Sequence, residues 1–206
     1  MSGRVEVDVF FDFGCPFVHS AAVWMDDVAR QLGGDAPIVT WKFFPLEQVN
    51  APEDAEMPIW DLPAERRSRG RDSLQAAAAA RGQGSEAFHR FHLALLRLRH
   101  EEDQDHGKRS VLEDAAARAE LDLERFRADL DDRSLLHQIR DEYTHAREQL
   151  GVFGTPTFVF PNGNSAYLQT LPPPPTADSV AVWHDFVTIV RDRPYLREIK
   201  RARRPQ

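Results

Sequence analysis

The chain has a single cysteine, Cys15, among its 206 residues. One cysteine cannot form a disulfide within the chain, which excludes the small secreted scaffolds that depend on disulfides and favours a cytoplasmic location. No apolar run reaches the roughly 18 residues of a membrane-spanning helix. The first residues also show no secretory signal with an apolar core and a cleavage site. We therefore expect no membrane partner.

Lysine is also scarce, since arginine outnumbers it 23 to 3, and the formal net charge is −7. The residues from 191 onward carry seven basic and two acidic side chains, which leaves −12 on the rest of the chain. Cations suit the C-terminal end of a helix, so we expect several of these arginines to end one. No other basic segment is interleaved with aromatic residues, and we expect no nucleic-acid partner.

What the chain does contain is typical of a folded protein. Hydrophobic residues make up 42% of it, and 13 Phe and 4 Trp argue against disorder. A chain of this length suits one domain, or one core that carries an inserted lobe.

Two strand-like segments flank a helix at the start of the chain. Residues 5–13 and 37–44 are rich in β-branched and aromatic side chains. Between them, Pro16 suits the first position of a helix, and Gly33-Gly34 is expected to end it. A strand, a helix and a strand in this order predict two parallel strands with a right-handed crossover.

A helical block follows. Residues 62–150 have few β-branched side chains and are rich in Ala, Arg, Glu and Leu, which predicts helices. The expected helix starts are Ser85, Ser110 in a capping box with Glu113, Asp122 and Ser134. Gly151 is expected to end the last of these helices.

The strand pattern returns after Gly151. Residues 157–160 and 165–169 flank Asn162-Gly163, which predicts an antiparallel hairpin. A last helix is expected to start near Asp178 and to be broken or kinked at Pro194.

The element order is β-α-β, a helical block, and then α-β-β-α. This order indicates the α/β class with a thioredoxin-like fold and a large all-helical insertion. We expect residues 1–59 and 136–206 to form the core, and residues 60–135 to form the insertion lobe.

Cys15 directly precedes Pro16 at the predicted junction of strand and helix. A thiol at this place faces the positive end of the helix dipole and N–H groups that lack helical partners. Both favour the thiolate, which is the nucleophilic form of cysteine. The alternative is a small buried apolar residue. The position before proline makes us favour the reactive thiol.

Two motifs together resemble the DsbA-like branch of the thioredoxin superfamily, and the resemblance covers nearly the whole chain. Cys15-Pro16-Phe17-Val18 stands where that family has Cys-Pro-x-Cys. Residues 151–157, Gly-Val-Phe-Gly-Thr-Pro-Thr, are similar to the cis-proline loop of the family.

The resemblance implies a cis bond between Thr155 and Pro156, next to the cysteine. In this geometry the backbone of Thr155 can pair with an extended peptide or a small thiol. Cys15 is the expected catalytic residue. The residues expected to bind the substrate are Pro16, Phe17, Val18, His19, Gly154, Thr155 and Pro156.

The chain departs from the family pattern at Val18, which replaces the second cysteine. Without a resolving thiol, Cys15 cannot close an internal disulfide. A monothiol route remains, in which the Cys15 thiolate attacks a disulfide and an external thiol resolves the mixed disulfide. Oxidation to a sulfenic acid followed by capping is a further route. This reading predicts a DsbA-family oxidoreductase that acts on a low-molecular-weight thiol or a protein disulfide.

Two other functions stay open. The core and the insertion also resemble 2-hydroxychromene-2-carboxylate isomerases and kappa-class glutathione transferases, which commonly have Ser in place of the first cysteine. There Cys15 would hold or polarise a bound thiol. The third reading is a redox-silent module that binds a peptide or a partner. We expect no bound cofactor, and glutathione or mycothiol as the co-substrate. Residues 193–201 look like the tail of mycothiol-dependent nitroreductases, which have two cysteines. Whether the chain forms a homodimer is left open.

Four further features are weaker candidates for functional sites. His89 and His92 are spaced for one helix face, but no third metal ligand is evident, so we expect two surface histidines and no metal. Residues 103–107 lack the spacing of a calcium loop. Trp60 is expected to pack rather than line a pocket. Asp12 either couples to the thiol or faces solvent.

Overall fold

The computed structural model describes residues 4–200. It contains a four-stranded sheet in the order β2-β1-β3-β4. The strands are β1 (Glu6–Phe11), β2 (Ile38–Phe43), β3 (Thr157–Val159) and β4 (Ser165–Tyr167). The β1 and β2 strands are parallel, whereas β3 runs antiparallel to both β1 and β4. The predicted thioredoxin-like α/β fold is therefore present.

Eight α-helices accompany the sheet in the described part of the chain. They are α1 (Pro16–Leu32), α2 (Leu46–Val49), α3 (Arg69–Arg81), α4 (Ser85–His100), α5 (Arg109–Arg118), α6 (Leu123–Leu130), α7 (Leu136–Glu148) and α8 (Ser179–Val190). Short 3-10 turns lie at Gly33–Asp35, Arg133–Leu135 and Thr176–Asp178. No helix within residues 4–200 is long and apolar enough to cross a membrane.

Alternation along β1 gives the sheet two buried faces. Val9 and Phe11 point into the large apolar cluster that includes α1, α4 and α8. Phe10, between them, belongs to a second cluster with Phe44 and Ala146 of α7. Successive side chains of a strand point to opposite faces, so β1 is buried on both. This accounts for the apolar run of residues 9–11 in the second half of the strand, whereas Glu6 and Asp8 in its first half are polar.

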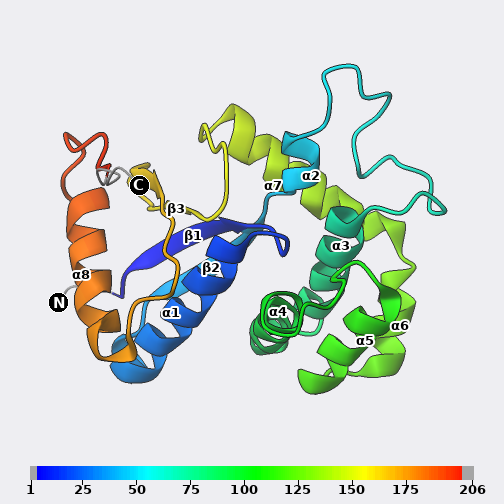
Figure 1. Cartoon of the computed structure of the whole chain (residues 1–206), viewed down its shortest axis with the longest axis horizontal. Coiled ribbons are helices and arrows are strands. Elements are labelled where there is room, and N and C mark those ends of the chain that lie inside the picture. The colour runs from blue at the N-terminus through cyan, green and yellow to red at the C-terminus, as the bar shows by residue number, and fades with distance from the viewer. Residues whose placement is uncertain (1–3, 201–206) are drawn as a thin grey trace, which may run out of the picture.

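The helices α3 to α6 follow β2 in the chain and gather away from α8 (Figure 1). They share the large apolar cluster with the sheet. Phe88 of α4, for example, lies edge-on to Phe11 of β1, with ring centroids 6.3 Å apart. The helix α4 also packs against α1.

Several expected helix boundaries are wrong. The helix α5 begins at Arg109 with Lys108 as its N-cap, so Ser110 is inside the first turn and caps nothing. The chain between α2 and α3 forms turns as far as Ser68, whose hydroxyl caps α3 by accepting from the Arg71 N–H. The helix α2 was not predicted at all.

The expectation that the last helix extends to Pro194 and ends with several arginines is also wrong. The helix α8 ends at Val190, before it reaches Pro194. Only Arg191, at the C-cap, is positioned to interact with its C-terminal dipole. The arginines at 193 and 197 lie beyond the helix, and those from residue 201 onward lie outside the described residues.

Candidate functional site

Cys15 is the N-cap residue of α1, with an extended backbone (φ −87°, ψ 117°). Its N–H donates to the Asp12 carbonyl, and its own carbonyl accepts from the Val18 N–H, each at 3.1 Å. Pro16 at the first helical position has no N–H, which is tolerated where helical donors lack partners. The turn after β1 and the start of α1 therefore hold the cysteine in one orientation.

The thiol points across to the loop before β3. Cys15 Sγ lies 3.2 Å from the Thr155 carbonyl oxygen, to which the thiol donates. The Thr155–Pro156 peptide bond is cis. Cys15 is 5% exposed and Thr155 is buried, and the Thr155 hydroxyl has no hydrogen-bond partner. The structure thus brings together Cys15 and the loop that the sequence singled out, 140 residues further along the chain.

The other predicted residues of the first helical turn differ in exposure. Pro16 is exposed and Phe17 is half-buried. Val18 is 0% exposed and belongs to the large apolar cluster. The expectation that Val18 touches the substrate is therefore wrong, because core packing covers its side chain completely. Phe17 and Pro16 provide the apolar surface next to the thiol.

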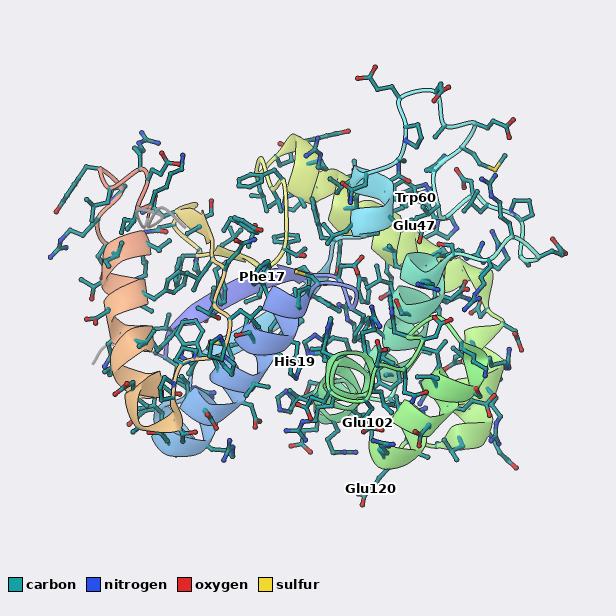
Figure 2. All side chains as sticks on the ribbon, in the orientation of Figure 1. Phe17, His19, Glu47, Trp60, Glu102 and Glu120 are labelled. Carbon is teal, nitrogen blue, oxygen red and sulfur yellow. The ribbon has the colours of Figure 1, made fainter. Side chains whose placement is uncertain are left out.

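His19 interacts with the end of α4 and points toward it (Figure 2). Its Nε2 lies 3.0 Å from Oε1 of Glu101, the C-cap of α4. Its ring stacks on that of His100, with centroids 5.5 Å apart. His100 Nε2 is 2.9 Å from the Phe13 carbonyl oxygen, which can only accept, so Nε2 carries the hydrogen. Burial lowers the pKa of His100 and keeps the ring neutral near pH 7.

Asp12 lies under the turn that carries the cysteine. The carboxylate accepts from the Gly14 N–H at 2.7 Å and from the Leu46 N–H at 2.8 Å. Burial raises the pKa of Asp12, and these two hydrogen bonds act in the opposite direction. The alternative that Asp12 faces solvent is wrong. The side chain ties the turn after β1 to the start of α2.

His106 packs against Gly14 next to Asp12. A Cβ on Gly14 would lie 3.1 Å from Asp12 Oδ1 and 3.7 Å from His106 Nε2, so the close packing leaves little room for a side chain. Burial is the largest cause that lowers the pKa of His106, to about 4. The histidine is therefore neutral at pH 7.

Two aromatic rings next to the loop were not predicted as site residues. Phe153 is 62% exposed and contacts Tyr167 of β4, with ring centroids 5.2 Å apart. A Cβ on Gly154 would lie 3.3 Å from the Tyr167 ring. Burial raises the pKa of the Tyr167 phenol, and the Cys15 thiolate adds to the shift by repelling the phenolate charge. Phe153 could have been identified from the sequence, because it lies within the motif of residues 151–157. No local sequence pattern identifies Tyr167 as a site residue.

The remaining candidates lie elsewhere. His89 is exposed, but the expectation of a surface position is wrong for His92, which is 0% exposed. Within residues 4–200 no three metal-ligating side chains form a cluster. Residues 103–107 form a loop at the end of α4, where Gly107 N–H donates to Asp105.

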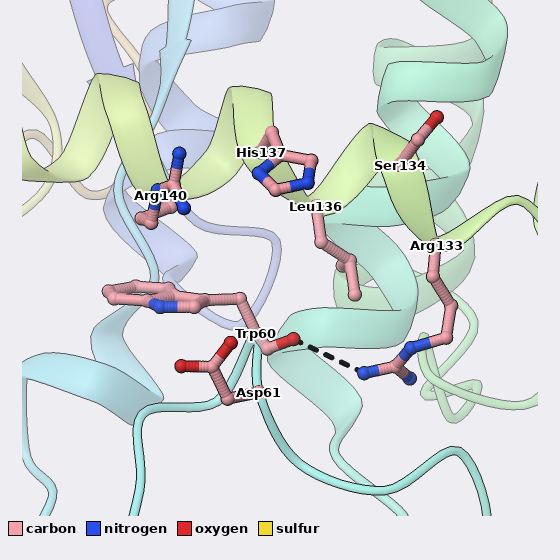
Figure 3. A pocket seen from close by; sticks show the side chains of 7 residues that line it. All are labelled: Trp60, Asp61, Arg133, Ser134, Leu136, His137 and Arg140. Carbon is pink, nitrogen blue, oxygen red and sulfur yellow. Dashed lines mark hydrogen bonds between the residues drawn. The ribbon is translucent and has the colours of Figure 1, made fainter.

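Trp60 lines a surface cavity of about 360 Å³ with residues at the start of α7, contrary to the expectation that it only packs (Figure 3). The Arg133 guanidinium donates to the Trp60 carbonyl. A second cavity of about 690 Å³ lies between the loop before α3 and the start of α5. Cys15 lines neither of these two cavities.

A sheet of this topology, a cysteine at the start of its first helix and a cis-proline loop facing it define a thioredoxin-like protein. The family model of the DSBA-like thioredoxin domain matches residues 6–175, and the chain belongs to this family.

The chain is also similar to a curated protein and to solved structures. An uncharacterized protein of Mycobacterium tuberculosis, Rv2286c, is 26% identical over 97% of this chain and 83% of its own length. A 2-hydroxychromene-2-carboxylate isomerase structure aligns with a TM-score of 0.62 at 16% identity, covering 94% of this chain and 100% of that chain. The cytosolic disulfide reductase DsbM of Pseudomonas aeruginosa, solved with GSH, gives a TM-score of 0.59 at 17% identity, covering 89% and 99%. At these identities the two structures support the fold.

Proposed function

We propose that the chain catalyses thiol–disulfide exchange through Cys15 alone, with a low-molecular-weight thiol as co-substrate. The observation that carries this proposal is the position of Cys15 at the N-cap of a 17-residue helix, with Sγ 3.2 Å from the Thr155 carbonyl. At this position the sulfur faces the positive end of the helix dipole and N–H groups that lack helical partners. The facing backbone offers an edge to which a substrate can bind.

The proposed cycle has two exchanges. The Cys15 thiolate attacks one sulfur of a disulfide, forms a mixed disulfide with that half, and releases the other half as a thiolate. A second thiolate, from glutathione or mycothiol, then attacks the sulfur bound to Cys15. This step restores the Cys15 thiolate and releases a new disulfide. The two electrons pass between the external thiol and disulfide, and the protein is unchanged at the end.

A mixed disulfide at Cys15 can be resolved by a second cysteine of the chain or by an external thiol, and Val18 excludes the first route. It occupies the position three residues after Cys15 and is fully buried in the core. Cys15 is the only cysteine in the chain, so an intramolecular attack cannot release the bound half. Release of the bound half therefore requires an external thiol. This requirement suits a cytoplasmic location, where such thiols are abundant.

The test is turnover of a small disulfide with reduced glutathione, coupled to glutathione reductase. The wild-type chain is expected to turn over, and Cys15→Ser is expected to abolish the activity. Met57→Ala, a change of an exposed apolar residue in the loop after α2, serves as the matched control and should retain it. Full activity in Cys15→Ser would refute the proposal.

A second candidate is a thiol-dependent isomerase or transferase. The observation in its favour is the Tyr167 phenol near Cys15, which could polarise a substrate carbonyl while Cys15 holds a bound thiol. The similarity to the isomerase structure supports it at the level of fold. This candidate predicts saturable binding of reduced glutathione and partial activity in Cys15→Ser. Exchange chemistry predicts that no such activity survives.

A further inference from the structure

Two contacting aromatic rings are exposed beside the proposed nucleophile. Phe153 is 62% exposed and Tyr167 is 36% exposed. Their ring centroids are 5.2 Å apart and their planes are inclined by 58°. A single exposed apolar residue is ordinary, whereas contiguous apolar surface marks places where something binds.

The backbone of the cis-proline loop connects these rings to the thiol. Phe153 and Gly154 directly precede Thr155, whose carbonyl accepts from Cys15 Sγ at 3.2 Å. The Tyr167 backbone pairs with Thr157 in the β3–β4 ladder, which places its ring over Gly154. The rings are therefore held by the same few residues that hold the thiol in place.

The glycine is part of this arrangement. A Cβ at Gly154 would approach Cε2 of Tyr167 to 3.3 Å, closer than most such contacts, so a larger residue would displace the ring. The Tyr167 hydroxyl also accepts from the Gln169 side-chain amide, which restrains the phenol from its far end. A ring that is held in place loses little conformational freedom when a partner stacks on it.

We propose that Phe153 and Tyr167 form an aromatic subsite that selects disulfide-bonded peptides with an aromatic side chain next to the reacting cysteine. The proposal rests on the exchange function of Cys15 and names its preferred substrate. The half of the disulfide that carries the aromatic side chain becomes bonded to Cys15, and the other half leaves as a thiolate. The peptide is favoured over a small thiol because only a peptide carries a side chain that can stack on the two rings while its backbone pairs with Thr155 of the cis-proline loop.

The test compares two symmetric disulfides, made from capped Phe-Cys and capped Ala-Cys dipeptides. Both present the same cysteine chemistry, so a difference in rate reports on the neighbouring side chain. The readout is the second-order rate constant for mixed-disulfide formation at Cys15, followed by mass spectrometry. The wild-type chain is expected to react about threefold to tenfold faster with the Phe-Cys disulfide, which is the range of an aromatic pair.

Four variants locate the effect. Phe153→Ala and Tyr167→Ala are expected to bring the ratio of the two rate constants close to one. Tyr195→Ala removes an aromatic ring that is 71% exposed beyond α8, and it is expected to keep the wild-type ratio. Far-ultraviolet circular dichroism and thermal unfolding verify that each variant is folded. Tyr167→Phe keeps the ring and is expected to keep the preference.

The outcomes separate this inference from the proposed function. Equal rates with both disulfides in the wild-type chain, or a preference that survives in both alanine variants, would overturn the aromatic subsite and leave the exchange function intact. No reaction with either disulfide would overturn the exchange function and the subsite together.

Discussion

His106 is expected to make the stability of the fold depend on pH. Its side chain is buried beside Gly14, and its Nδ1 has no hydrogen-bond partner. Burial is the largest cause that lowers its pKa from 6.5 to about 4, and the positive charge of Arg99 adds to it. Asp105 acts in the opposite direction but does not compensate.

The sign of the effect follows from this direction. Because the pKa of His106 is lower in the folded chain, the unfolded chain takes up the proton first as the solution is acidified. The contribution of the neutral ring is complete above pH 6.5 and is lost as the pH falls to about 4. Each tenfold change in proton affinity corresponds to about 1.4 kcal/mol, so the loss amounts to about 3 kcal/mol.

Urea unfolding followed by tryptophan fluorescence measures this loss. The wild-type chain, His106→Gln and His184→Gln are compared at about pH 7 and about pH 4.5. Glutamine is polar and does not titrate, so His106→Gln is expected to lose about 2 to 3 kcal/mol less than the wild type over this interval. His184 is exposed on α8 and controls for the loss of a histidine. An unchanged pH dependence in His106→Gln would refute the reasoning.

Three further predictions concern the core and the site. Val18→Cys adds a thiol three residues after Cys15, and the oxidised variant is expected to form an internal disulfide. Thiol titration and mass spectrometry would then detect no free thiol and no glutathione adduct, and a persistent adduct would contradict the expectation. His92→Phe replaces a fully buried ring whose two nitrogens have no partner, and it is expected to raise the free energy of unfolding by about 1 kcal/mol at pH 7. Burial lowers the pKa of His92 well below its usual value, so this gain should widen in acid, and urea unfolding that shows it shrinking would count against the reasoning. Asp12→Ala removes the acceptor of two backbone N–H groups and is expected to cost about 2 to 4 kcal/mol in urea unfolding and to slow the reaction of Cys15. Unchanged stability would contradict the role assigned to this carboxylate.

The elements that could be predicted have strong local signals. Pro16 and Gly33 bound α1, and the structure confirms both ends. Asn162-Gly163 predicts the hairpin of β3 and β4, which is confirmed with an antiparallel register. Asp122 caps α6 as expected, accepting from the N–H groups of the first turn. In each case the residue that determines the geometry is adjacent to the element it bounds.

The elements that were missed depend on distant contacts. Glu47 of α2 accepts from the Ser68 hydroxyl and the Gly70 N–H, so a four-residue helix is stabilised by the start of α3. No local pattern reports such a contact. The position of His92, by contrast, could have been inferred, because it lies four residues after Phe88 and three before Leu95 on the buried stripe of α4.

The residues of the candidate site also divide into those with a local sequence signal and those without one. Cys15 and the loop at Thr155 could be located because each belongs to a recognisable motif in the expected order. Glu101, His106 and Tyr167 come from the end of α4, the loop after it and the edge strand. They meet the site only through tertiary packing.

The most direct measurement of Cys15 as a nucleophile is its rate of alkylation by iodoacetamide at neutral pH, in the folded chain and in urea. As the only thiol, it gives an unambiguous signal. The unpaired N–H groups at the start of α1 face the sulfur only while the helix exists, so the account predicts that the folded chain reacts faster than the unfolded one. Labelling that is slower in the folded chain, or that requires unfolding, would show that Cys15 is a packing residue and contradict the proposed chemistry.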